Sequence, residues 1–224
     1  MLNDIELVLP MAVRSVRPMS WMGVQLALKR AFDLVGSLTL ILFLGPVMVA
    51  AAAAVRLSSK GPVFFRQKRW GRAGVQFNCW KFRTMHTGQD RLVDPATVRR
   101  LQHQGILLKL KNDPRVTRVG AFLRQTSIDE LPQLFNVLMG DMSLVGPRPL
   151  MLHMLEPYPD LCEARGQVRP GITGLWQISA REQNENAQQM AQYDLAYIRD
   201  FSLWADLKIM ARTPSVVLFR RGAY

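Results

Sequence analysis

Residues 34–55 read LVGSLTLILFLGPVMVAAAAAV, a run of 22 residues without a charged side chain. A helix of that length rises about 33 Å, which is enough to cross the roughly 30 Å hydrocarbon core of a bilayer. Asp33 precedes the run and Arg56 follows it. The segment therefore predicts a helix that enters a membrane; a buried helix of a soluble protein and a cleaved signal peptide are the alternatives.

Basic residues flank this run on both sides. Lys29 and Arg30 precede it, and the residues that follow include Arg56, Lys60, Arg66, Lys68, Arg69 and Arg72. Since positive charge keeps a flank in the cytoplasm, a single crossing cannot satisfy both ends. Gly45 and Pro46 lie at the middle of the run, where proline removes one helical hydrogen bond and favours a kink. We therefore predict a re-entrant helix–break–helix with its break at Gly45–Pro46; a kinked helix that spans the membrane is the alternative.

The chain is both strongly basic and rich in apolar residues. Its 224 residues carry a formal net charge of +12 and are 49% hydrophobic. The length suits one domain with a sizeable core, or at most two small ones. The charge indicates an anionic partner, which can be nucleic acid, an anionic membrane surface or a phosphorylated substrate. Cys79 and Cys162 form no C-x-x-C pattern, which argues against a disulfide framework or a zinc site.

The sequence pattern predicts an α+β fold that is mostly helical. Residues 1–20 read as a poorly ordered arm, 21–56 as the membrane-associated segment and 57–224 as the main domain. Two strand-like pieces separated by the glycines of WGRAG predict a small β-hairpin, at 63–66 and 75–82. Helices are expected at 90–111, 132–139, from 185 onward and at 202–212, and proline- and glycine-bearing loops dominate 146–174.

A pair of carboxylates stands out in this basic chain. The stretch SIDELPQLFNVLMGDMSLVGPRP, residues 127–149, contains Asp129 and Glu130. Ser127 and Glu130 match the S-x-x-E capping box, so one interpretation is ordinary helix-start chemistry. Pro132 complicates it, because the proline would fall inside the first turns of a helix capped at Ser127. The helix therefore either begins near Pro132 or carries a defect there.

The other interpretation is catalytic. A carboxylate can act as a nucleophile toward phosphorus and form an acyl phosphate. It then needs cations that bind the phosphate, and Arg124, Arg148 and Arg169 lie in turn- or loop-rich positions nearby in the sequence. A hard divalent cation bound by carboxylates can bridge to such a substrate. The chain has no Walker A, G-x-G-x-x-G or H-E-x-x-H pattern, so phosphate binding would rest on these arginines.

Several segments together resemble one known family. They are KRAFDLVGS at 29–37, GPVFFRQKRWG at 61–71, KFRTM at 81–85, DPRVTRVGAFLRQTSIDELPQLFNVLMGDMSLVGPRP at 113–149, RPGITGLWQISAR at 169–181 and DLKIM at 206–210. In this order they resemble the bacterial sugar transferases, the monotopic phosphoglycosyl transferases. The resemblance favours the catalytic interpretation of Asp129 and Glu130.

The resemblance implies a specific activity and location. Such enzymes transfer a sugar 1-phosphate from a UDP-sugar to undecaprenyl phosphate, release UMP and require Mg²⁺. They work at the cytoplasmic face of the inner membrane, where some initiate exopolysaccharide synthesis. Residues 57–224 would then form a cytoplasmic catalytic domain with interfacial helices. Membrane lipid is an expected partner and nucleic acid is not, and a homo-oligomer is compatible with the sequence.

The resemblance also assigns roles to residues. Asp129 is the expected nucleophile that holds a phosphosugar intermediate, and Glu130 is expected to assist it, with both carboxylates near the metal. Lys81, Arg124, Arg148 and Arg169 are expected to hold phosphates, and Asp141 to orient one of them or the metal. The rival hypothesis is a non-catalytic, basic, membrane-associated protein that binds anionic lipid; its binding would weaken with salt and survive the loss of Asp129.

Overall fold

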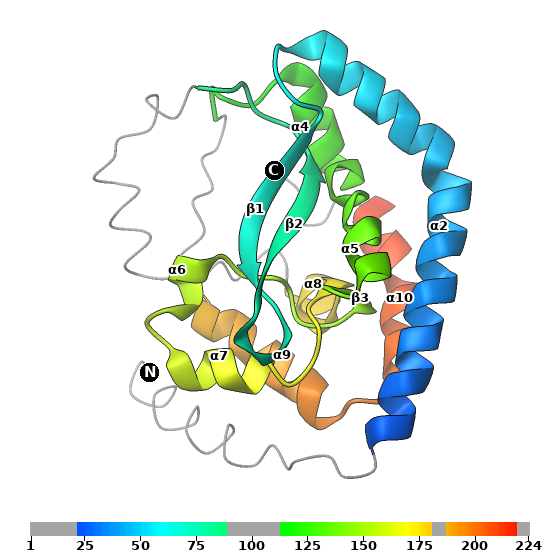
Figure 1. Cartoon of the computed structure of the whole chain (residues 1–224), viewed down its shortest axis with the longest axis vertical. Coiled ribbons are helices and arrows are strands. Elements are labelled where there is room, and N and C mark those ends of the chain that lie inside the picture. The colour runs from blue at the N-terminus through cyan, green and yellow to red at the C-terminus, as the bar shows by residue number, and fades with distance from the viewer. Residues whose placement is uncertain (1–21, 89–112, 181–186, 219–224) are drawn as a thin grey trace.

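The computed structural model describes residues 22–88, 113–180 and 187–218 (Figure 1). In these ranges the fold is α+β and mostly helical, which confirms the predicted class. The elements are α2 (Met22–Ser58), β1 (Phe64–Trp70), η1 (Arg72–Gly74), β2 (Gln76–Phe82), α4 (Arg118–Gln125), η3 (Ile128–Glu130), α5 (Gln133–Met139), β3 (Ser143–Val145), α6 (Leu152–Leu155), α7 (Pro159–Arg165), β4 (Gly171–Thr173), α8 (Leu175–Ser179), α9 (Ala187–Arg199) and α10 (Leu203–Leu218). The arm predicted at 1–20 and the helix predicted at 90–111 lie outside the described residues.

Helix α2 is one uninterrupted helix of 37 residues that contains Pro46. The predicted break at Gly45–Pro46 is therefore wrong. Proline deletes one backbone donor and its ring crowds the preceding turn, and a helix can absorb both effects by bending. Figure 1 shows α2 bowed along one side of the molecule.

One face of α2 is apolar and exposed. Among the described residues, α2 alone is long and apolar enough to cross a membrane, and only 17% of its most apolar stretch is buried. Leu42 and Phe43 are 76% and 75% exposed, whereas Met48 and Val55 on the inner face are buried. A core helix of a soluble protein would be buried on most sides, so this exposure disfavours that alternative and favours contact with lipid.

The predicted hairpin is present. Strands β1 and β2 pair antiparallel from Phe64 opposite Phe82 to Trp70 opposite Gln76. The connecting turn contains Gly74 at φ 71°, in the left-handed region that glycine adopts at little cost. The buried Asn136 side chain ties the hairpin to α5, because its Oδ1 accepts from Trp80 N (3.0 Å) and its Nδ2 donates to Asn78 O (2.8 Å).

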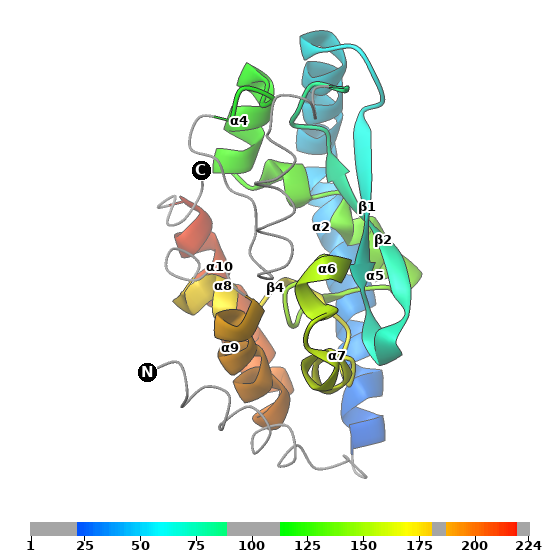
Figure 2. The same ribbon diagram turned by 90° about the vertical axis from the view of Figure 1, so that its left-hand side faces the viewer.

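Residues 146–174 contain more structure than the sequence predicts. Helices α6 and α7 and the short strand β4 lie in this stretch. Strand β4 pairs in parallel with β3, which lies just before it. In the view of Figure 2, α8, α9 and α10 form one side of the molecule, and α2, α5 and the hairpin form the other. The buried ion pair between Arg165 of α7 and Asp194 of α9 joins elements far apart in the sequence. Such partners have no local pattern, so the sequence analysis missed them.

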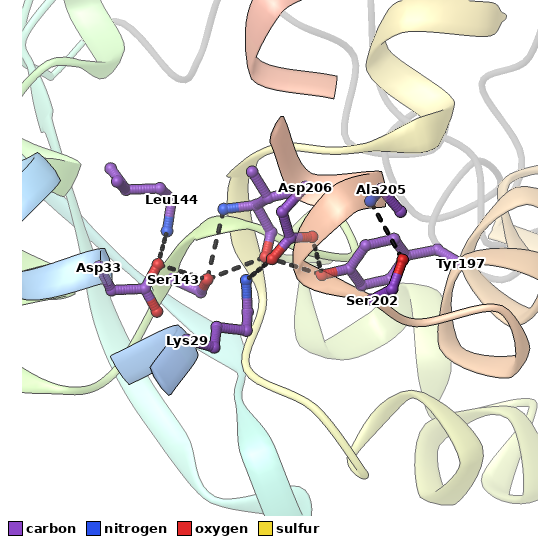
Figure 3. Close-up of polar contacts among 9 residues, drawn as sticks. Lys29, Asp33, Ser143, Leu144, Tyr197, Ser202, Ala205 and Asp206 are labelled. Atoms are coloured by element: carbon purple, nitrogen blue, oxygen red, sulfur yellow. Dashed lines mark hydrogen bonds and ion pairs between the residues drawn. The ribbon is translucent and has the colours of Figure 1, made fainter. Parts of the chain in front are cut away.

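The first turns of α2 are held by a buried ion pair (Figure 3). Lys29 Nζ lies 2.5 Å from Asp206 Oδ2 of α10, and both side chains are almost fully buried. The hydroxyl of Tyr197 donates to the other oxygen, Asp206 Oδ1, at 2.8 Å. The carboxylate therefore has a partner on each oxygen, as a buried charge requires.

Two more side chains of α2 bind the main domain. Asp33 Oδ1 accepts from Ser143 Oγ (2.9 Å) and from Leu144 N (3.0 Å) in β3. Arg30 donates to the carbonyls of Val137 and Leu138 in the last turn of α5, where a cation offsets the helix dipole. The membrane-facing helix is thus fixed to the domain by polar contacts at its N-terminal end.

Candidate active site

Asp129 and Glu130 lie on η3, a single 3-10 turn between α4 and α5. Ser127 precedes it in the left-handed conformation (φ 57°) and makes no side-chain capping hydrogen bond. The capping-box interpretation is therefore wrong. Helix α5 begins directly after Pro132, which confirms the predicted helix start near this proline. A non-glycine residue in this conformation costs on the order of 1–3 kcal/mol, and such strain is often found at functional sites.

Two cations bind Glu130. Lys81 Nζ of β2 lies 2.6 Å from Glu130 Oε1, and Arg148 Nη2 lies 3.3 Å from the same oxygen. The Arg148 guanidinium also lies 5.7 Å from the centroid of the Trp176 ring. Glu130 thereby holds two cations, from separate parts of the chain, next to Asp129.

Asp129 is a buried carboxylate, 8% exposed. Burial is the main cause that raises its pKa to about 6, and the neighbouring charge of Glu130 raises it further. The positive charges of Lys81, Arg124 and Arg148 act in the opposite direction. A carboxylate that is poorly solvated and surrounded by cations has the character of a nucleophile for an anionic substrate.

Arg124 comes to this site from the last turn of α4. Its Nε donates to Thr84 Oγ1 at 2.8 Å, just beyond the end of β2. Burial lowers the pKa of Arg124, and the charge of Asp129 opposes that shift. A Cβ on Gly120 would lie 2.0 Å from Thr84 O, so only glycine lets α4 approach the end of the hairpin this closely.

Arg69, which the sequence analysis counted only as a membrane-flanking charge, contacts the chain at Pro149, next to Arg148. Burial is the main cause that lowers the pKa of Arg69 to about 10. The charge of Arg148 also lowers this pKa, and the charge of Glu130 raises it. Its Nη1 donates to Pro149 O at 3.2 Å, but its Nε is buried without a hydrogen bond to any described residue. The signal available in the sequence was its place in the GPVFFRQKRWG segment; the β-pairing sets Arg69 opposite Phe77, at the other end of the hairpin from the Phe65–Lys81 pair.

Asp141 and Arg169 lie at the opposite end of α5 from Asp129. Asp141 Oδ2 accepts from Asn136 Nδ2 at 3.1 Å, and Arg169 Nε donates to Gly140 O at 2.7 Å. Burial lowers the pKa of Arg169, as do the nearby charges of Arg72 and Arg30. The structure thus brings together Asp129, Glu130, Lys81, Arg124 and Arg148, and it sets Asp141 and Arg169 apart from them.

The residues fit a shared magnesium ion better than a dedicated metal cage. Within 22–88, 113–180 and 187–218, no group of three or more His, Cys, Asp and Glu side chains is placed to hold a metal. Magnesium commonly binds proteins through one or two carboxylates and completes its shell with water and substrate phosphates. Asp129 and Glu130 match that donor set.

A mostly apolar groove of about 410 Å³ opens beside these carboxylates. Glu130 and Arg148 are its charged lining residues, and Leu44 and Val47 line it from near the middle of α2. The site therefore joins a cluster of cations and carboxylates to a mostly apolar space that reaches the exposed apolar helix α2.

Comparison with known proteins agrees with this arrangement. The family model described as bacterial sugar transferase matches residues 24–220. The chain is 45% identical over 204 residues to an uncharacterized sugar transferase of Haemophilus influenzae, covering 88% of this chain and 42% of that protein. It is 44% identical over 210 residues to the UDP-glucose:undecaprenyl-phosphate glucose-1-phosphate transferase of Escherichia coli, covering 90% of this chain and 42% of that protein. It is also 39% identical over 219 residues to the exopolysaccharide production protein ExoY of Rhizobium meliloti, covering 96% of this chain and 94% of that one.

The extent of these matches differs between relatives. The chain spans about two fifths of the length of the Haemophilus and Escherichia proteins and nearly all of the Rhizobium protein. The family model covers most of the described structure, including every residue of the carboxylate and cation cluster. The chain therefore belongs to the bacterial sugar transferase family.

Proposed function

We propose that this chain transfers a sugar 1-phosphate from a UDP-sugar to undecaprenyl phosphate, releases UMP and so initiates synthesis of an exopolysaccharide or another glycoconjugate. The observation that carries the proposal is Asp129, a buried carboxylate with a raised pKa among Lys81, Arg124 and Arg148. The name of the Escherichia relative supports the substrate classes, and that of the Rhizobium relative supports a role in exopolysaccharide synthesis.

In the first step an Asp129 carboxylate oxygen attacks the phosphorus that carries the sugar. A new O–P bond forms, the bond from this phosphorus to the bridging oxygen of the diphosphate breaks, and UMP leaves with the electron pair. Lys81, Arg124 and Arg148 reduce the repulsion between the carboxylate and the phosphates. Glu130 positions Lys81 and Arg148 through the two ion pairs described above.

In the second step a phosphate oxygen of the lipid attacks the same phosphorus. The acyl-phosphate bond breaks, its electron pair returns to Asp129, and a polyprenyl diphosphate sugar is formed. One phosphate linkage replaces another, so the overall free-energy change is small. Positioning and charge neutralisation must therefore supply most of the rate.

Magnesium, held by Asp129, Glu130 and substrate phosphates, would supply further neutralisation of phosphate charge when bound. Lys81 and Arg148 also bind Glu130, so these two cations and the magnesium ion would neutralise the charge of the same substrate.

We also propose that both ends of α2 stay on the cytoplasmic side of the inner membrane. The N-terminal end is bound through Lys29 to Asp206, and near the C-terminal end the Arg83 Nη2 donates to Val55 O at 3.2 Å. The same domain holds both ends, so a full crossing would draw charged groups of that domain into hydrocarbon. A bent helix with its exposed apolar face in one leaflet avoids this cost.

Labelling from outside the cell tests that topology. In a variant without native cysteines, a cysteine at Val24 or at Lys60 is expected to resist a membrane-impermeant thiol reagent in intact cells. Both positions should react after the membrane is permeabilised. A cysteine in a known periplasmic loop of another protein serves as the positive control. Labelling of either flank in intact cells would contradict the one-sided topology.

The raised pKa of Asp129 predicts a pH dependence. The ionised carboxylate is the nucleophile, so kcat/KM for the UDP-sugar is expected to fall as pH drops below about 6, by about tenfold per pH unit. The measurement is initial UMP release between pH 5 and 8 at low UDP-sugar concentration. A kcat/KM that stays constant from pH 7 down to pH 5 would contradict the assignment.

The overall activity is tested with purified protein in detergent, magnesium, undecaprenyl phosphate and a panel of radiolabelled UDP-sugars. Label that passes into the lipid phase with equal release of UMP supports the proposal and identifies the sugar. Folded protein that transfers no label from any donor contradicts it.

A further inference from the structure

The groove beside Glu130 is amphipathic along its length. Its charged lining residues are Glu130 and Arg148, and its other polar lining residues are Thr126, Ser127, Thr173, Gln177 and Thr213. Apolar walls come from three parts of the chain, with Leu44 and Val47 in α2, Ile172 and Ile178 in β4 and α8, and Val216 and Val217 in α10. This arrangement matches a ligand that has an anionic head and a hydrocarbon chain.

The dimensions and the opening of the groove agree with such a ligand. Its volume of about 410 Å³ lies within the ~300–1,000 Å³ typical of small-molecule sites. A sugar or a nucleotide would need several polar partners along these walls, whereas a hydrocarbon needs none. Val47 lies on the groove and is 39% exposed on α2, so the apolar space continues onto the surface that we expect to face lipid.

Among the polar residues that line the groove, two threonines have partners within the protein, whereas Gln177 Oε1 is buried without a hydrogen-bond partner among the described residues. The hydroxyls of Thr173 in β4 and Thr213 in α10 lie 2.8 Å apart, and Thr213 also donates to Ile209 O at 2.8 Å. The contact between the two threonines joins α10 to β4, and the bond to Ile209 O lies within α10. The threonine hydroxyls therefore need no ligand, and α10 holds Val216 and Val217 in the wall.

We propose that this groove binds the hydrocarbon chain of a polyprenyl phosphate, with the phosphate at the Arg148 end and the chain passing between α10 and the middle of α2. This inference rests on the proposed function for the identity of the lipid. It adds the path of the acceptor chain: the lipid enters from the leaflet beside Leu44 and Val47, and its phosphate meets the sugar-bearing phosphorus at Asp129.

Photocrosslinking tests the path without requiring turnover. The full-length protein in detergent is mixed with a polyprenyl phosphate that carries a diazirine within its first isoprene units. Crosslinks are expected on peptides that contain residues 44–47, 172–178 and 216–217, and excess undecaprenyl phosphate should suppress them. Crosslinks confined to the exposed outer face of α2, around Leu42 and Phe43, would overturn the proposal.

A groove-filling variant tests the consequence for activity. Val216→Trp is expected to raise the KM for undecaprenyl phosphate more than about tenfold, since losing the burial of two methylene groups weakens binding by about that factor. UMP release in the first half-reaction, measured without lipid, should stay within about twofold of wild type. The matched control is Leu207→Trp, on the same helix but 44% exposed and outside the groove, and it should leave the KM unchanged.

The outcomes separate this inference from the proposed function. Normal turnover with an unchanged KM in Val216→Trp would overturn the groove assignment and leave the transferase standing. Competed crosslinks in the groove without sugar transfer from any donor would support the groove and overturn the transferase. Equal loss of both half-reactions in Val216→Trp, with wild-type thermal unfolding, would overturn the inference that the groove serves the lipid alone.

Discussion

Asp129→Asn is expected to abolish sugar phosphate transfer, lowering the rate at least about 1,000-fold. An amide oxygen cannot form the acyl phosphate, so no intermediate accumulates and the remaining cations have no nucleophile to assist. The measurement is UMP release and label transfer with purified wild type and variant. The matched control is Asp160→Asn, the same change at an exposed carboxylate of α7, which should keep full activity.

The same substitution is expected to stabilise the fold at neutral pH. The folded-state pKa of Asp129 is about 6, above the ~3.9 of an unfolded chain, so the ionised form disfavours folding by up to about 3 kcal/mol at pH 7. This penalty is absent below about pH 4, develops between about pH 4 and pH 6, and is complete above about pH 6. The thermal unfolding temperature of Asp129→Asn should therefore be higher than that of wild type at pH 7 and equal to it at pH 4.

For the activity prediction, substantial residual turnover in folded Asp129→Asn would contradict the nucleophile assignment.

Lys29→Met is expected to cost roughly 3–5 kcal/mol of folding free energy, because it leaves the buried carboxylate of Asp206 without its cation. Tyr197 still donates to this carboxylate, but a hydroxyl does not replace a charge. The contact anchors α2 to α10, so its loss should also loosen the membrane helix from the domain. Urea or thermal unfolding in a fixed detergent measures the change.

The chain contains a control for this prediction. Arg199 and Asp200 form an ion pair at 2.8 Å with both side chains more than 60% exposed, so Arg199→Met should cost far less folding free energy than Lys29→Met. In the double variant Lys29→Met/Asp206→Leu, much of the lost stability should return, since no uncompensated charge stays buried. Equal effects of Lys29→Met and Arg199→Met would show that burial does not govern the Lys29 pair.

Local patterns in the sequence predicted the elements that carry their own signals. The two strand-like pieces and the glycines of WGRAG between them predicted the hairpin, and Pro132 predicted the start of α5. The resemblance to the sugar transferases brought Lys81, Arg124 and Arg148 to the carboxylates, and their contacts agree with it. The expected roles of all these residues stay predictions.

Features that depend on packing were not predictable in this way. The Arg165–Asp194 pair joins α7 to α9, and the hydrogen bond from Arg69 to Pro149 O joins β1 to a residue far along the chain. Proline chemistry alone did not show whether α2 would break or bend at Pro46, because the contacts of Met48 and Val55 with the domain hold the second half. The resemblance likewise assigned Asp141 and Arg169 to the site of Asp129, whereas α5 lies between them and Asp129.

Trapping the intermediate tests the central claim most directly. Purified protein is mixed with magnesium and a UDP-sugar labelled at the sugar-bearing phosphate, with no lipid acceptor, and the quenched protein is digested and analysed by mass spectrometry. The account predicts a sugar phosphate on the peptide that contains Asp129, one UMP for each label, and loss of the label when undecaprenyl phosphate is added. Transfer that proceeds with lipid while the protein never carries label, and while UMP appears only after the lipid is added, would contradict it.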